Sequence, residues 1–131
     1  MQKKALLALA VLGVVAGTVA AEDTWTVTGT FTHPGVADGL MVYIKLVDPG
    51  PNCLSPEPAD YATEVVMKDG KATYTLENVY EGEYTACAFI DLAKQEGVPK
   101  PDSGDPAAVE GLEVRGNTTL DFDEDAWVPF P

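Results

Sequence analysis

The sequence predicts an all-β protein, and specifically a seven-stranded antiparallel β-sandwich. First, apolar side chains recur at every second position in several short runs after residue 21, which is the spacing of half-buried strands. Second, Gly, Pro, Asn and Asp separate these runs at the short intervals that turns require. Third, apolar residues at helical spacing are nearly absent from this region.

Residues 1–21 have the organisation of a secretory signal peptide. A basic start precedes an apolar run from Ala5 to Ala16, and mostly small residues continue to Ala21. These small residues fit cleavage before Glu22 or one residue earlier. The apolar run is short for a membrane span, although an uncleaved N-terminal anchor is the alternative. We therefore expect a periplasmic or extracellular protein with a single domain, residues 22–131, and no membrane insertion after cleavage.

The first two predicted strands show the alternation clearly. Residues 24–31 alternate threonines with an inward-facing set, which is Trp25, Val27, Gly29 and Phe31. The turn residues His33-Pro34-Gly35 end this strand, because proline lacks a backbone donor and glycine allows the turn. Residues 40–47 form the second strand, whose inward-facing side chains are Val42, Ile44 and Leu46.

A loop with four prolines, residues 48–60, separates the second strand from the third, because such a run cannot join a sheet ladder. Residues 61–67 and 71–76 are the third and fourth predicted strands. Asp69-Gly70 lies between them and is a strong signal for a two-residue hairpin turn. We therefore expect these two strands to pair.

Residues 83–91 predict a central strand, because both alternating faces are rather apolar. An acidic loop, residues 92–107, follows it. Residues 108–114 and 118–122 complete the seven strands, with a turn at 115–117. The remaining tail is acidic and then aromatic, and we expect Trp127 and Phe130 to fold back on the sandwich.

The charge of the chain excludes several partners. All 21 acidic residues lie after residue 21 against six basic ones, so residues 22–131 carry a net charge of −15. Such a surface repels nucleic acid and anionic membranes. It attracts divalent cations, although a simply well-solvated surface is the alternative.

Cys53 and Cys87 are the only two cysteines. In an exported chain an even cysteine count favours a disulfide. The bridge would close a loop of about 35 residues and contribute roughly 3–4 kcal/mol in the chain-entropy model. The alternative is a reactive or metal-binding thiol pair, but the two cysteines lack CxxC spacing and a neighbouring histidine.

Several short motifs form a pattern along residues 24–122. They are Val27-Thr28-Gly29-Thr30, Leu76-Glu77-Asn78-Val79, Gly82-Glu83-Tyr84, Ala88-Phe89-Ile90-Asp91 and Asp102-Ser103-Gly104-Asp105-Pro106. The pattern resembles the carboxypeptidase regulatory-like domains, which share a transthyretin-like (prealbumin-like) β-sandwich of broadly immunoglobulin-like architecture. The resemblance implies a non-catalytic accessory or binding module, whose partner would be a protein or a carbohydrate.

Some members of that family carry a calcium loop after the matching strand. In this chain Asp91 matches the first position of that loop, and Asp102, Gly104 and Asp105 match its end. Ala93 and Gln95 replace an asparagine pair in the middle. The resemblance therefore implies calcium as the possible cofactor, with Asp91, Asp102 and Asp105 as ligands, and calcium prefers such oxygen ligands. The alternative is that these carboxylates only accept hydrogen bonds from loop N–H groups.

The residues do not predict an enzyme. Some relatives of transthyretin hydrolyse 5-hydroxyisourate, but they use several histidines and a C-terminal Tyr-Arg-Gly-Ser, whereas this chain has a single histidine and ends Val-Pro-Phe-Pro. His33 lies in a predicted turn, without an obvious catalytic partner. We expect a binding or structural role, with a calcium-binding module as one alternative and a hydrolase of unknown type as the other.

Overall fold

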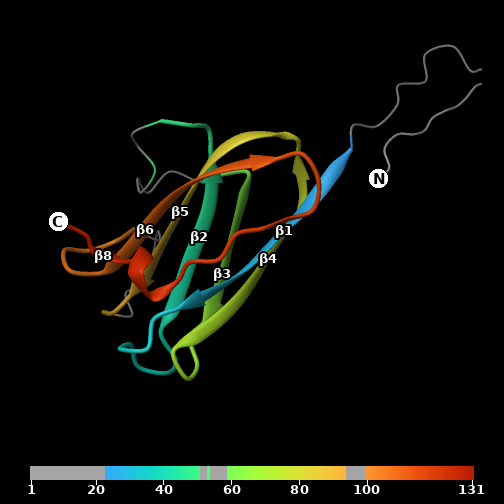
Figure 1. The fold of residues 1–131 in the computed structure, drawn as a ribbon. Coiled ribbons are helices and arrows are strands. Elements are labelled where there is room, and N and C mark those ends of the chain that lie inside the picture. The colour runs from blue at the N-terminus through green and yellow to red at the C-terminus, as the bar shows by residue number, and fades with distance from the viewer. Residues whose placement is uncertain (1–22, 51–52, 54–58, 94–99) are drawn as a thin grey trace, which may run out of the picture.

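The computed structural model describes residues 23–50, 53, 59–93 and 100–131. They form two β-sheets that enclose one apolar core (Figure 1). The three-stranded sheet has the order β4-β1-β7 and the five-stranded sheet has the order β3-β2-β5-β6-β8. This arrangement confirms the all-β, two-sheet prediction. The predicted signal peptide lies outside the described residues.

The strands agree closely with the predicted ones, but the count of seven is not confirmed. The described residues contain eight strands, of which two are only two residues long. The elements are β1 (Thr24–Thr32), β2 (Met41–Val47), β3 (Tyr61–Val66), β4 (Lys71–Tyr80), β5 (Gly82–Asp91), β6 (Pro106–Val114), β7 (Thr118–Thr119), a 3-10 turn η2 (Glu124–Ala126) and β8 (Val128–Pro129). β6 begins at Pro106, so the last two residues of the predicted loop 92–107 belong to a strand.

The core forms where the alternating side chains of the two sheets meet. β2 supplies Val42, Ile44 and Leu46, which are buried as predicted, and β4 supplies the buried residues Ala72, Tyr74 and Leu76. β5 lies between β2 and β6, as the apolar character of both its faces indicates. Its Ala86, Ala88 and Ile90 belong to the core, while Cys87 and Phe89 are buried on its other face.

The Asp69-Gly70 turn forms, but it does not join a hairpin. Both residues have positive φ angles, 53° and 76°, and Lys68 pairs with Lys71 across them. β3 nevertheless pairs with β2, and β4 pairs with β1 in the other sheet. Met67 accounts for the difference, because its backbone is still bonded to Gly39 and Leu40 beside β2. The chain therefore changes sheet at the turn, and the predicted pairing of these two strands was wrong.

The C-terminal tail packs on the core and adds an edge strand to the five-stranded sheet. β8 pairs with the start of β6, which adds a strand that the alternation did not reveal. The Trp127 ring packs against Phe31 and Phe122, and its indole N–H donates to the carbonyl of Thr32 at 2.9 Å. The backbone of Phe130 bonds to Gly104 and Asp105. The tail therefore folds back as expected, and it fixes the end of the acidic loop.

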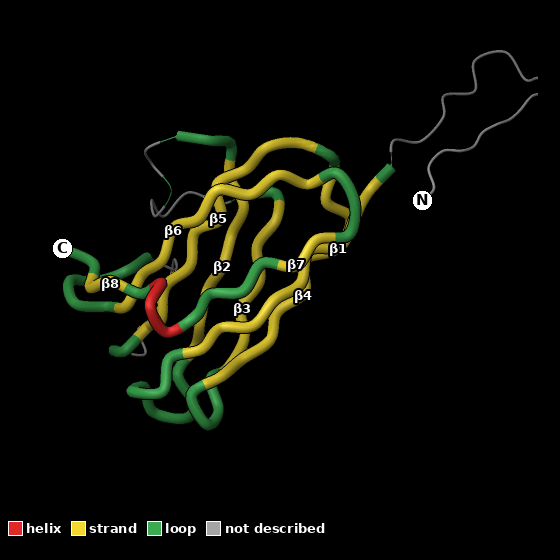
Figure 2. Tube along the Cα trace, in the orientation of Figure 1, coloured by secondary structure: helices red, strands yellow, loops and turns green. Residues whose placement is uncertain are grey.

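The segment around β7 crosses from the five-stranded to the three-stranded sheet and lies parallel to β1 (Figure 2). Leu120 N–H donates to Thr28, and the Leu120 carbonyl accepts a 2.5 Å hydrogen bond from the Tyr74 hydroxyl. Gly29 makes this approach possible. A Cβ there would overlap the Leu120 carbonyl oxygen and lie 2.7 Å from the Tyr74 ring.

We predict that Gly29→Ala lowers the free energy of unfolding by about 3 kcal/mol or more, because overpacking at a rigid backbone contact cannot be relieved by a rotamer change. Urea denaturation followed by tryptophan fluorescence measures the loss. Gly111→Ala is the matched control, since a Cβ at that strand position meets nothing within 4 Å. Equal stability of the two variants would contradict the close contact.

Candidate functional site

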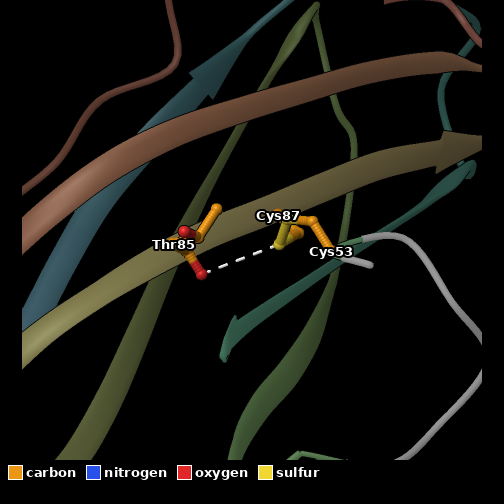
Figure 3. Close-up of a disulfide and its surroundings, with 3 residues drawn as sticks. All are labelled: Cys53, Thr85 and Cys87. Atoms are coloured by element: carbon orange, nitrogen blue, oxygen red, sulfur yellow. Dashed lines mark hydrogen bonds between the residues drawn. A yellow bond between two sulfur atoms is a disulfide. The ribbon is translucent and has the colours of Figure 1, made fainter. Parts of the chain in front are cut away.

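The predicted disulfide between Cys53 and Cys87 is present (Figure 3). The two Cα atoms lie 5.8 Å apart, and the two cysteines are 34 positions apart in the sequence. The Cys87 sulfur also lies 3.6 Å from the Thr85 carbonyl oxygen, a contact without a shared proton because a disulfide sulfur carries none. The bridge attaches the proline-rich segment to the outer face of the central strand.

The structure brings together the three aspartates that were predicted as metal ligands. One carboxylate oxygen from each of Asp91, Asp102 and Asp105 lies within 4.8 Å of the other two. Asp91 and Asp105 are only 5% and 3% exposed, and they are the only buried charged residues in the part of the chain that the structure describes. Gln95 of the predicted calcium loop lies outside the described residues.

Secondary structure places each member of this aspartate cluster. Asp91 is the last residue of β5 and pairs with Met41 in β2, so the central ladder fixes its position. Asp105 immediately precedes β6. Asp102 and Asp105 close a turn in which Asp105 N–H donates to the Asp102 carbonyl at 3.0 Å, and Gly104 supplies the positive φ of 92°.

The hydrogen bonds leave acceptor capacity in the cluster. The Asp105 carboxylate accepts from Leu92 N–H at 3.3 Å and from Asp102 N–H at 2.8 Å, one bond to each oxygen. Asp102 Oδ2 is buried and has no hydrogen-bond partner among the described residues. A carboxylate oxygen has two lone pairs, so the Asp105 oxygens retain capacity even with these bonds. The cluster can therefore offer several oxygens to a hard cation.

The electrostatics of the cluster favour a divalent cation. Three carboxylates within a few ångströms repel one another, and burial weakens the solvent screening of that repulsion. The charge of Asp91 also acts on Tyr43 of β2. The pKa of this phenol is raised chiefly by burial and further by the charges of Glu64 and Asp91. Calcium takes six to eight oxygen ligands in flexible geometry, and carboxylates are its preferred side-chain ligands.

Sequence reasoning missed a second group of side chains, at the other end of β5. A pocket of about 220 Å³ lies among Tyr84 of β5, Tyr61 of β3, and Asp48 and Asp60 at the two ends of the proline-rich segment. The sequence does show that Asp48 and Asp60 follow and precede neighbouring strands. It does not show that Tyr84 enters the space between them.

The pKa of the Tyr84 phenol reports the environment of this pocket. Burial chiefly raises it to about 12, and the hydrogen bond to Tyr61 and the charges of Tyr61, Asp48 and Asp60 add to the effect. All these causes disfavour the phenolate. A negative charge on Tyr84 is therefore costly in this pocket.

Comparisons of the chain with family models, curated proteins and solved structures give no match. The resemblance to carboxypeptidase regulatory-like domains therefore stays a prediction. Among the described residues, no helix has both the length and the apolar character that crossing a membrane requires. The function has to be argued from the two groups of residues above.

We predict that Tyr84 makes stability fall between about pH 10 and pH 12. The pKa in the folded state, about 12, lies above the unfolded value near 10. The contribution of the protonated Tyr84 to the free energy of unfolding is therefore complete below pH 10, and it is lost as the pH rises through the pKa of the folded state. Urea midpoints at half-unit intervals from pH 9 to pH 12 should fall more steeply for the wild type than for Tyr84→Phe. Parallel curves would contradict this assignment.

Proposed function

We propose that this protein is an exported, non-enzymatic β-sandwich module of the transthyretin-like type with a binding role. The two-sheet architecture and the central position of β5 support the fold type. The Cys53–Cys87 bridge supports export, because such bonds persist mainly outside reducing compartments. The signal-like residues 1–21 add to that argument.

The position of His33 favours a binding role over catalysis. Its ring lies against Trp127, with the ring centroids 6.0 Å apart, and its backbone N–H donates to the Gly70 carbonyl. The Nδ1 atom of the ring is buried and has no hydrogen-bond partner among the described residues, so no described side chain positions the ring for proton transfer. Turnover of a hydrolase substrate that was lost in His33→Ala would favour the hydrolase alternative.

The second candidate function is calcium binding, and the observation that carries it is the convergence of the Asp91, Asp102 and Asp105 carboxylates. Burying carboxylates together raises the free energy of the folded state unless a cation or hydrogen bonds compensate. Two backbone N–H groups compensate part of the charge of Asp105. We propose that Ca²⁺ compensates the remaining negative charge of the three carboxylates and thereby holds Asp102 and Asp105 beside the end of β5.

We predict that a bacterial host exports the full-length chain and cleaves it near residue 21. The basic start and apolar run should direct translocation, and the disulfide should then form. Fractionation followed by intact mass measurement should give an oxidised periplasmic chain that begins at Glu22 or one residue earlier. A chain lacking residues 1–21 is the control and should stay in the cytoplasm. An uncleaved cytoplasmic product from the full-length chain would contradict export.

We predict that Ca²⁺ raises the melting temperature of the domain and that Asp102→Asn abolishes the effect. A ligand at 100 times its dissociation constant adds about 2.7 kcal/mol to the free energy of unfolding. For a domain of this size that corresponds to a rise of roughly 10 °C. In EDTA, Asp102→Asn should melt at or above the wild-type temperature, because it removes one repelling charge. Calorimetry with Ca²⁺, Mg²⁺ and EDTA measures both effects.

Asp102→Asn should thus lose the calcium-dependent rise in melting temperature without a loss of stability in EDTA. This combination distinguishes a calcium ligand from a residue that only stabilises the fold. Glu110→Gln is the matched control, because Glu110 is an exposed acidic residue on β6 and lies outside the cluster. It should retain the full calcium shift. No shift of the wild type at 10 mM Ca²⁺, a concentration about 100 times the dissociation constant of the tighter extracellular sites, would remove calcium from the proposed function.

A further inference from the structure

The pocket at the start of β5 has aromatic walls and an acidic rim. The rings of Tyr61 and Tyr84 meet edge to face, with centroids 5.7 Å apart and planes at 88°. Leu46 and Val47, at the end of β2, and Ala59 supply its apolar lining. The lining residues that the structure describes lie at the ends of β2, β3 and β5 and beside them.

Both tyrosine rings are fixed by the backbone of one residue on the opposite sheet. The Tyr84 hydroxyl donates to the Tyr80 carbonyl at 2.6 Å, and the Tyr61 hydroxyl accepts from Tyr80 N–H at 3.2 Å. Tyr80 is the last residue of β4. The rings therefore need little reorganisation when a ligand binds, which lowers the entropic cost of binding.

The two carboxylates at the rim have no cationic partner among the described residues. Asp48 and Asp60 are both exposed, and neither is part of an ion pair. The only described arginine, Arg115, pairs instead with Glu81 and Glu113. The rim thus combines two available negative charges with two aromatic rings, whose faces are electron-rich.

This combination favours an organic cation. Aromatic faces attract ammonium and guanidinium groups, and nearby carboxylates add Coulomb attraction. The apolar lining suits the methylene stem of a lysine or arginine side chain. A small inorganic cation fits less well, because it needs a shell of oxygens that two carboxylates and two already bonded hydroxyls do not supply.

We propose that the Asp48–Asp60–Tyr61–Tyr84 pocket binds a lysine ammonium or an arginine guanidinium group, presented by a basic peptide segment of a partner. The inference rests on the proposed binding role and gives that role a ligand class. The pocket is distinct from the aspartate cluster, because Tyr84 and Asp91 are seven residues apart on β5, about 23 Å along an extended strand.

The test titrates the oxidised domain, in EDTA, with Nα-acetyl-lysine N-methylamide, the arginine equivalent and the uncharged norleucine equivalent. Binding is followed by ¹H–¹⁵N shift changes. We expect both cationic probes to shift the amides of residues 46–48, 60–61 and 84, with millimolar dissociation constants, and the norleucine probe to shift them much less. A short lysine-containing peptide and free choline then distinguish a peptide-borne cation from a free quaternary amine.

Paired variants separate the pocket from the general acidity of the protein. Asp48→Asn with Asp60→Asn should weaken binding about fivefold or more, since two exposed ion pairs are removed. Glu124→Gln with Asp125→Asn is the control, because it removes the same charge at the exposed 3-10 turn. Tyr84→Phe keeps the ring and should retain most of the affinity, whereas Tyr61→Leu should lose it while the domain still melts cooperatively.

Three outcomes would overturn the inference. They are equal binding of the norleucine probe, equal weakening by the two charge-matched double variants, and amide shifts centred away from the pocket. None of them bears on export or on calcium binding, because those proposals are tested by fractionation and by the calcium-dependent melt. Failure of the pocket is therefore distinguishable from failure of the proposed function.

Discussion

The burial of β5 on both faces is the constraint on which the rest of the structure depends. Its inner face supplies Ala86, Ala88 and Ile90 to the core, and its outer face carries the half-cystine Cys87 and Phe89, which stacks on Tyr43. Because β2 and β6 pair along nearly its whole length, the strand has little freedom to shift. Both candidate sites therefore have a rigid support, the tyrosine pocket at its start and the aspartate cluster at its end.

The large negative charge determines how such a small domain is stabilised. A net charge of −15 over residues 22–131 raises the free energy of the compact state through self-repulsion. The disulfide offsets part of this, because it reduces the conformational entropy of the unfolded chain. The tail offsets another part, since Trp127 packs on the Phe31 and Phe122 rings and Phe130 bonds to the acidic loop. With the fold stabilised in this way, the domain can hold carboxylates close together, as in the aspartate cluster.

Local sequence patterns predicted strands and turns correctly. They failed for strand pairing and for the tyrosine pocket, which depend on contacts between residues far apart in the sequence. Alternation identified the inward face of β2, and the two apolar faces of β5 identified a central strand. The Asp69-Gly70 pair predicted the turn correctly, but not its partners, because turn geometry does not determine which sheet the next strand joins. The Asp91, Asp102 and Asp105 set was found through a motif resemblance. The Tyr61–Tyr84 pocket was not found, because Tyr80 of the opposite sheet orients both rings.

The groups of residues at the two ends of β5 favour different kinds of cation, because they differ in burial and in the chemistry of their side chains. At the aspartate end the carboxylates are mostly buried, so an ion must lose its water there and gain oxygen ligands in exchange. A lysine side chain at that end would leave several carboxylate lone pairs unmatched. At the tyrosine end the carboxylates are exposed and the walls are aromatic, so an organic cation gains contacts with the ring faces and the apolar lining that Ca²⁺ does not make. We therefore expect the two proposed sites on this strand to select ligands of different chemistry.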